Sequence, residues 1–140
     1  MTRDEAVHRL REARVGRLAT VRPDGTPHVV PFVFALVEDD RTLRVYWAVD
    51  DKPKRDPKIQ RLANIRANPA VEFVVDAYDE DWTRLWWVRV RGRARVVLAD
   101  PEAARARTAL AQKYPAYADG RSIDTVIAID VGSVSGWTAV

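Results

Sequence analysis

The amino-acid sequence predicts a small antiparallel β-barrel with short helices, formed by one domain that spans residues 1–140. Three observations support this fold class. Short apolar segments recur at regular spacing along the chain, and turn-forming residues separate them. Few segments show helical periodicity, which favours a barrel over a doubly wound sheet. The composition, 47% hydrophobic and 31% charged, is that of a globular protein rather than a disordered or fibrous one.

The first third of the chain is predicted to form a helix and two strands. Thr2 and Glu5 have the spacing of a capping box, so a helix is expected over residues 3–13. A strand over 15–21 follows and ends at a Pro-Asp-Gly sequence typical of turns. The next strand is expected over 28–37, and its nearly unbroken apolar run predicts that both of its faces are covered.

The middle of the chain is predicted to contain a third strand, a helix and a fourth strand. Glu38-Asp39-Asp40 is expected to form a hairpin turn before a strand over 43–49. A charged loop with a proline follows. Asp56-Pro57 then provides an N-cap and a suitable first residue for a helix that ends at about Ala67. The fourth strand is expected over 71–76.

The last third of the chain begins with an acidic turn over 79–81 and a long strand over 84–98, which Gly92 allows to bend or bulge. Asp100-Pro101 repeats the N-cap pattern, so a helix is expected from there to about Tyr114. Residues 115–122 are expected to be a loop. The last core strand is expected over 125–131, with or without a continuation to Trp137.

Several kinds of catalytic site are excluded by residue content. The chain has no cysteine, which excludes a disulfide scaffold, a cysteine nucleophile, an iron–sulfur cluster and a thiolate zinc site. Its two histidines, His8 and His28, are too few and too scattered for a metal site. No G-x-S-x-G, G-x-G-x-x-G or Walker sequence is present. Either a bound organic cofactor carries the chemistry, or the protein only binds a ligand.

The charge balance and the apolar runs indicate a cytoplasmic protein with neither nucleic acid nor membrane as partner. The net charge of +3 is mild, because 23 basic residues oppose 20 acidic ones. The longest apolar run, over 29–37, is far shorter than the roughly 20 residues of a membrane span. The lack of cysteine also fits a reducing cytosol.

A basic segment from Lys52 to Arg61 is the first candidate binding element. It holds five basic residues and one acid, leaves a strand and opens a helix. A helix N-terminus offers free N–H groups and a partial positive charge, so nearby cations complete an anion site. Lys58 and Arg61 share one helix face. The alternative is a solvated charged loop.

A strand rich in tryptophan and arginine is the second candidate. Alternation places Trp86 on one face with valines, and Trp87 on the other with Arg89 and further arginines. Such side chains can stack on a planar ligand and hold its anionic groups. The alternatives are a core or a dimer interface for the tryptophans and a solvated face for the arginines. Single-stranded nucleic acid is a weaker possibility, because the acidic turn lies beside the aromatics.

Four segments carry a resemblance to a known family. GRLATVRPDGTPH at 16–28 resembles the opening strands of the pyridoxamine-5'-phosphate-oxidase-like (PPOX class) split-barrel flavin-binding proteins. WAVDDKPK at 47–54, RLANIRANP at 61–69 and DEDWTRLWWVR at 79–89 resemble more specifically the actinobacterial F420-dependent oxidoreductases, the B-type branch of the flavin/deazaflavin oxidoreductases. The first segment is shared across the superfamily, and the other three are typical of the branch.

This resemblance implies a six- or seven-stranded split barrel that forms a homodimer, with cofactor sites at the dimer interface. The implied activity is hydride transfer between coenzyme F420, a deazaflavin with a phosphate and a polyglutamate tail, and a small organic substrate. An activated alkene, an enone or a quinone-like compound is expected as substrate. The alternatives are an oxidoreductase of the same fold that binds FMN and a non-enzymatic cofactor-binding protein.

The resemblance also implies roles for individual residues. His28 and Pro31 are expected at the edge of the cofactor ring, with Ala48 and Val49 lining it. The phosphate and tail are expected to be held by Lys52, Lys54, Lys58 and Arg61, with Asn64 supporting that loop. A wall from the second subunit or on the substrate side is expected to contain Trp82, Trp86, Trp87 and Arg89.

Overall fold

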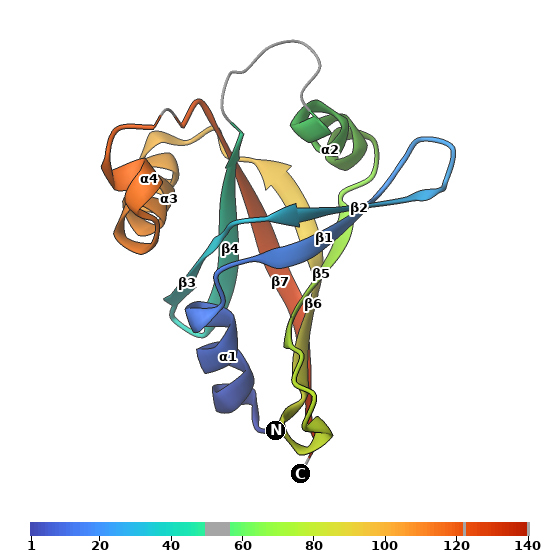
Figure 1. The fold of residues 1–140 in the computed structure, drawn as a ribbon. Helices are drawn as coiled ribbons and strands as arrows, with labels where there is room; N and C mark the ends of the chain where they lie inside the picture. Colours follow the sequence, from blue (N-terminus) through green and yellow to red (C-terminus); the bar gives the residue numbers. More distant parts are fainter. Residues whose placement is uncertain (50–56, 122, 140) are drawn as a thin grey trace.

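Seven antiparallel strands form one sheet in the part of the chain that the structure, a computed structural model, describes: residues 1–49, 57–121 and 123–139. The strand order is β2-β1-β5-β6-β7-β4-β3. The sheet curls so that β1 and β2 cross over β4 and β7 (Figure 1). The strands are β1 (Gly16–Val21), β2 (Pro27–Phe32), β3 (Ala35–Asp39), β4 (Thr42–Val49), β5 (Ala70–Ala77), β6 (Trp86–Val96) and β7 (Thr125–Thr138). The predicted antiparallel barrel is therefore confirmed.

Four α-helices and a short 3-10 helix surround this sheet within the same residues. They are α1 (Arg3–Glu12), α2 (Pro57–Ala67), η1 (Trp82–Arg84), α3 (Asp100–Lys113) and α4 (Pro115–Ala118). The predicted capping box begins α1: Glu5 N donates to Thr2 Oγ1 at 3.2 Å, and Thr2 N donates to Glu5 Oε2 at 3.0 Å. None of the helices in the described ranges is long and apolar enough to cross a bilayer.

The strand predicted over 28–37 is in fact two strands. β2 pairs with β1 and ends at Phe32, whereas β3 starts at Ala35 and pairs with β4. These two strands lie at opposite edges of the sheet order, so the chain crosses between them and closes the barrel. The prediction that both faces of this segment are covered is wrong for β2, where Val29 is 61% exposed. Its apolar run reflects a barrel edge rather than a central strand.

The turn between β3 and β4 lies two residues later than predicted. Asp40 and Arg41, with φ of 45° and 69°, form the two-residue turn, and Asp39 already pairs with Thr42. Both central residues of such a hairpin turn need positive φ, which aspartate tolerates better than most residues.

Three further expectations are wrong at the ends of elements. The long strand starts at Trp86, because Trp82 to Arg84 form η1, which Asp81 caps by accepting from Thr83 N at 3.1 Å. Asp100 is not an N-cap: Ala99 is, without a side-chain bond, and Asp100 is the first helical residue. Residues expected as a loop after Tyr114 include α4. In contrast, the last strand does continue beyond Trp137, to Thr138.

Gly92 marks the predicted irregularity in the long strand. The register of β6 against β7 shifts between Arg91 and Gly92. A Cβ at Gly92 would lie 2.5 Å from the carbonyl oxygen of Asp130, so only glycine allows the two strands to approach here.

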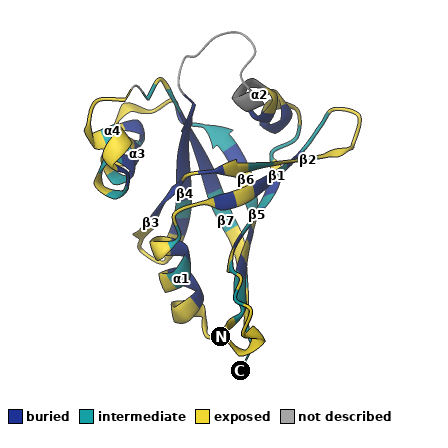
Figure 2. Cartoon of the chain, in the orientation of Figure 1, coloured by how far each residue is buried: buried dark blue, intermediate teal, exposed yellow. Residues whose placement is uncertain are grey.

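The core has two layers that share β4. Inside the barrel, Phe32, Phe34, Trp47 and Phe73 pack together with aliphatic residues from the other strands. On the outer face, α3 packs on Tyr46 and its neighbours. β4 is therefore buried on both sides over most of its length, as Figure 2 shows. Its end therefore offers a well-packed surface beside which a ligand can bind.

Candidate functional site

A pocket of about 230 Å³ opens beside the end of β4. β3 pairs with β4 only as far as Tyr46, so Trp47 and Ala48 have no β3 residue opposite them. The last residues of β2 form the facing wall. The lining residues are Val15, Pro31, Phe32, Val33, Trp47, Ala48, Arg61 and Tyr117. The unpaired edge of β4 presents main-chain N–H and C=O groups. A ligand in the pocket can therefore form hydrogen bonds with β4 while it contacts apolar side chains.

Arg61 is placed in this pocket by the way α2 is attached to the barrel. Asn64 of α2 is fully buried. Its Nδ2 donates to Thr20 Oγ1 at 2.9 Å, and its Oδ1 accepts from Gln60 Nε2 at 2.7 Å. Arg61, about one turn earlier, is 5% exposed, and its Nη1 lies 3.5 Å from the carbonyl oxygen of Pro31. A buried guanidinium in an apolar pocket favours a ligand with an anionic group.

Trp47 lines the pocket and carries a buried N–H group. Its ring packs edge-on against Phe32, with centroids 5.8 Å apart. Within the described part of the chain, its buried Nε1 has no hydrogen-bond partner. Leaving such a donor unpaired costs about 1–3 kcal/mol. A ligand that brings an acceptor oxygen or nitrogen to Trp47 would recover this energy.

His28 lies on β2 opposite Thr20, upstream of the pocket wall. Its Nδ1 is buried and has no partner among the described residues. Burial and the positive charges of Arg22 and Arg61 lower the pKa of His28, so its imidazole is neutral at neutral pH. It does not line the pocket. In the described residues, no group of three or more histidine or acidic side chains could hold a metal ion.

Comparisons with known proteins identify the family. The family model described as pyridoxamine 5'-phosphate oxidase matches residues 2–138, almost the whole chain. The chain belongs to the pyridoxamine 5'-phosphate oxidase family. The resemblance seen in the sequence is therefore correct at this level, and the fold is the split barrel of that family. No curated protein sequence matches the chain.

Several solved structures share this fold at low sequence identity. The conserved hypothetical protein Rv2991 from Mycobacterium tuberculosis is 21% identical, with a TM-score of 0.76 over 99% of this chain and 86% of that one. An FAD binding protein from Mycobacterium smegmatis is 21% identical, with a TM-score of 0.66 over 98% and 94%. The haem storage protein HutZ from Vibrio cholerae is 17% identical, with a TM-score of 0.67 over 97% and 93%.

Three of the residues implied as cofactor ligands meet in the pocket of this family member: Pro31, Ala48 and Arg61. Val49 instead packs into the barrel core. Asn64 is buried and does not line the pocket, and the loop that it is predicted to support lies outside the described residues. Lys52 and Lys54 lie outside the described residues. Lys58 is within α2, but its side chain is also outside what the structure describes.

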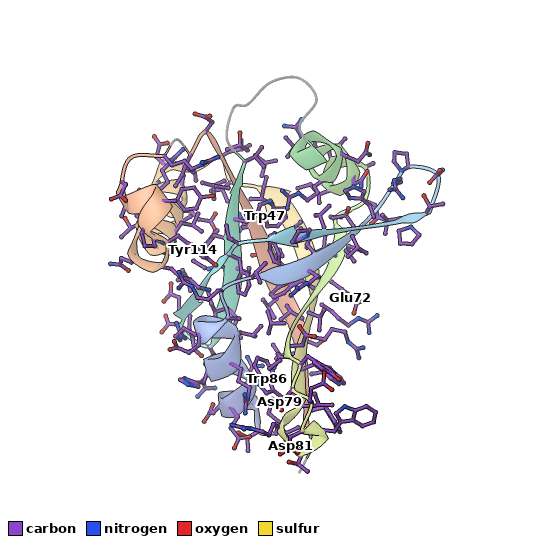
Figure 3. The ribbon with its side chains drawn as sticks, viewed as in Figure 1. Trp47, Glu72, Asp79, Asp81, Trp86 and Tyr114 are labelled. Carbon is purple, nitrogen blue, oxygen red and sulfur yellow. The ribbon has the colours of Figure 1, made fainter. Side chains whose placement is uncertain are left out.

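The expected tryptophan wall is not a single surface of one chain. Trp86 faces α1, where the Arg9 guanidinium lies 4.4 Å from its ring centroid. Trp87 lies on the opposite face of β6, with Arg89 5.2 Å from its ring, and Trp82 is 68% exposed on η1. Figure 3 places Trp86 near the chain ends and Trp47 toward the other end of the molecule. Within one chain, these four residues do not face the pocket.

A second polar cluster, which we call the Arg95 network, lies under α3. Arg95 donates to both carboxylate oxygens of Glu102 at 2.7 and 2.8 Å, and to Asp130 at 2.7 and 3.1 Å. Tyr46 Oη donates to Glu102 at 2.7 Å, and Arg44 Nε donates to Asp130 at 3.2 Å. Hydrogen bonding from Arg95 lowers the pKa of Glu102 to about 2. Burial and the Glu102 carboxylate raise the pKa of Tyr46 to about 12.

Two important pocket residues could not be found from the sequence pattern. Trp47 alternates with core residues of its strand, so nothing distinguished its indole from another core side chain. Tyr117 lies in a segment predicted as a loop, far in sequence from the rest of the pocket. The pairing of β3, which starts opposite Tyr46, leaves Trp47 at an opening, and Tyr117 reaches the same opening from α4.

Proposed function

We propose that the pocket beside β4 binds the ring of a flavin-type cofactor, specifically the deazaflavin F420, and that the protein is an F420-dependent oxidoreductase. The observation that carries this proposal is a pocket with apolar walls whose lining includes the buried Arg61 and Trp47, whose buried N–H has no partner among the described residues. A flat heterocycle with carbonyl and ring-nitrogen acceptors and an attached anionic group fits all three features. When bound, such a cofactor supplies hydride transfer, chemistry that side chains lack.

The residues present fit that group in distinct roles. Pro31 and Ala48 offer flat apolar contact from opposite strands. Trp47 donates its N–H to an acceptor on the ring, and the free edge of β4 provides further main-chain partners. Arg61 balances negative charge, and its burial strengthens that attraction by excluding water. The chain would thereby bind and orient the ring.

The choice of F420 over FMN depends on charge. FMN has one phosphate and no polyanionic tail, whereas F420 carries a phosphate and a polyglutamate chain. The segment from Lys52 to Arg61 contains more cations than one phosphate requires. The sequence resemblance to the F420-dependent branch supports the same choice. An activated alkene, an enone or a quinone-like compound is the substrate class we propose, and FMN remains the alternative cofactor.

The protein is further proposed to act as a homodimer with the cofactor between subunits. The pocket is smaller than the roughly 300–1,000 Å³ of typical small-molecule sites, so walls from another chain are needed to enclose a three-ring cofactor. Val15 and Val33 at its rim are each 38% exposed, and Val29 on the adjoining strand is 61% exposed. The tryptophans of β6 and η1 in a second subunit are candidates for the missing wall. A monomer in sedimentation at micromolar concentration contradicts this part of the proposal.

Titration of the wild-type protein tests the cofactor assignment. F420, FMN, haemin and a single-stranded oligonucleotide are added in separate experiments, and quenching of tryptophan fluorescence is followed. The proposal expects saturable binding of F420, tighter than FMN, with affinity that falls as salt increases. If FMN binds more tightly than F420, the cofactor is assigned as a flavin instead of a deazaflavin. Binding of haemin or the oligonucleotide alone rejects the proposed function.

A further inference from the structure

The end of α3 is fastened to the pocket by side chains that do not line it. Tyr114 is buried, and its hydroxyl accepts from Phe34 N at 3.1 Å. The same hydroxyl faces two acceptors, the carbonyl oxygens of Arg14 at 3.0 Å and Phe34 at 3.1 Å. Lys113 Nζ donates to the Phe34 oxygen at 2.8 Å and lies 4.2 Å from the Phe34 ring centroid. Both main-chain groups of Phe34 are thus held by α3.

Arg14 also contacts the end of α3. Its Nη2 donates to the carbonyl oxygen of Lys113 at 2.9 Å, and its guanidinium lies 4.7 Å from the ring centroid of Tyr114. Arg14, Phe34, Lys113 and Tyr114 therefore form one connected cluster, which we call the latch. It joins the segments around Arg14 and Phe34 to the end of α3, which lies 79 to 100 residues further along the chain.

Each segment in the latch carries a pocket-lining residue next to it. Val15 follows Arg14, Val33 precedes Phe34, and Tyr117 comes one turn after Tyr114, with their rings in edge contact at 6.3 Å. All three residues belong to the wall of the pocket. Moving any latch residue shifts the backbone that carries this wall.

A second connection runs through the aromatic core. The ring of Phe34 stacks on Phe32 at 5.1 Å with 22° between their planes. Phe32 in turn meets Trp47 at the other side of the pocket. Phe34 is fully buried, so its position is coupled to both walls.

We propose that the latch is a positioning device that fixes the Val15, Val33 and Tyr117 wall and so sets the affinity of the pocket for its cofactor ring. This inference rests on the proposed function. Ligand-contacting groups need to be held to within a fraction of an ångström by the side chains behind them. Lys113 and Tyr114 are therefore positioning residues, since they act through Phe34 and Arg14 rather than on the ligand.

The charge of Lys113 gives the latch a pH dependence. Burial lowers the pKa of Lys113 to about 8; Arg14 and Arg11 lower it further, and Glu12 opposes them. Burial raises the pKa of Tyr114, which stays neutral. Phe34 presents only its ring and main chain. Between pH 7 and 9 the amine loses its charge and with it the cation–π contact to Phe34, worth roughly a two- to fivefold change in affinity.

Two variants and two controls test the latch. Tyr114→Phe removes the hydroxyl and keeps the ring, and Lys113→Met keeps the apolar stem. Tyr46→Phe removes a buried tyrosine hydroxyl that donates to Glu102 rather than to Phe34, and Arg107→Met removes an exposed bond from the same helix as Lys113, at 3.4 Å to the Ile123 oxygen. Dissociation constants for F420 and FMN are measured from pH 6.5 to 9, together with hydrogen exchange of the Phe34 amide in the cofactor-free protein.

The expected result is that Tyr114→Phe speeds exchange of the Phe34 amide and weakens cofactor binding about fivefold or more, whereas both controls bind like the wild type. Lys113→Met is expected to flatten the decline of affinity between pH 7 and 9. Unchanged affinity in a folded Tyr114→Phe protein overturns the proposal, as does a wild-type pH profile in Lys113→Met. A wild type that binds neither cofactor rejects the proposed function itself, while amide exchange still reports on the latch.

Discussion

The Arg95 network and the pocket both include residues of β4, Tyr46 in the first and Trp47 in the second. They differ in whether their buried polar groups have hydrogen-bond partners. Under α3, Arg95 meets two carboxylates, and Glu102 also accepts from Tyr46. In the pocket, the buried N–H of Trp47 has no acceptor among the described residues. Buried polar groups are normally paired. A complete cluster therefore indicates a structural role, whereas a buried donor that lacks an acceptor in a residue lining a pocket favours a ligand there.

This comparison predicts that damage to the Arg95 network affects folding and not binding. Arg95→Met leaves Glu102 and Asp130 without their main partner, so we expect the free energy of unfolding to fall by about 2–3 kcal/mol, less than for a fully buried ion pair. Urea denaturation measures this loss. Arg93→Met, an exposed neighbour on β6, serves as the control and should change stability by less than about 0.5 kcal/mol. Altered cofactor affinity in folded Arg95→Met protein would contradict the assignment of a purely structural role to the Arg95 network.

The opposite outcome is expected for the pocket cation. Arg61→Gln removes the buried positive charge but keeps a polar side chain, and charge-assisted contacts to an anionic group contribute about 1.5–3 kcal/mol. Affinity for F420 should therefore drop about tenfold to a hundredfold. Arg66→Gln, an exposed position on the same helix, should bind like the wild type. Equal losses in both variants would mean that only the overall charge of α2 matters.

The Arg95 network should also determine how the free energy of unfolding changes at acid pH. The pKa of Glu102 lies at about 2 in the folded protein, against 4.5 when it is free. Its contribution is complete above pH 4.5 and is lost as the pH falls toward 2, because the unfolded chain takes up the proton first. We expect a loss of about 2 kcal/mol over this range beyond that seen in Glu102→Gln. Urea midpoints at several pH values measure the difference, and parallel curves for the two proteins would show that Glu102 does not control it.

The sequence predicted the barrel and most of its elements because these depend on local signals. The Thr2–Glu5 capping box and the alternation along β6 are examples that need no tertiary information. The break between Phe32 and Ala35 could not be predicted in this way, since it depends on which strands lie at the two edges of the sheet. Strand pairing, not local preference, divided that apolar run.

The site was predictable only in part for the same reason. Pro31, Ala48 and Arg61 were implied by the family resemblance and do meet in one pocket. Trp47 and Tyr117 had no local pattern to distinguish them, because one alternates with core residues and the other follows a helix. Trp86 and Trp87, which stood out in the sequence, lie away from this pocket in the same chain. The conspicuous tryptophans therefore lie outside this pocket within one chain, and their place in the site of a second subunit stays a prediction.

The smallest expected effect provides the most direct test of that last point. Trp47→Phe keeps an aromatic ring against Phe32 but removes the indole N–H. In the cofactor-free protein, losing an unpaired buried donor offsets part of the cost of the smaller ring, so we expect unfolding free energy to change by no more than about 1 kcal/mol. Cofactor affinity should instead fall about three- to tenfold, as expected for one neutral hydrogen bond. The cofactor's own absorbance measures binding without relying on tryptophan emission. Trp137→Phe, which changes a half-exposed tryptophan on β7 outside the pocket, is the matched control. If both variants bind F420 equally well, Trp47 donates no hydrogen bond to the ring, and recognition then depends on Arg61 and the free edge of β4.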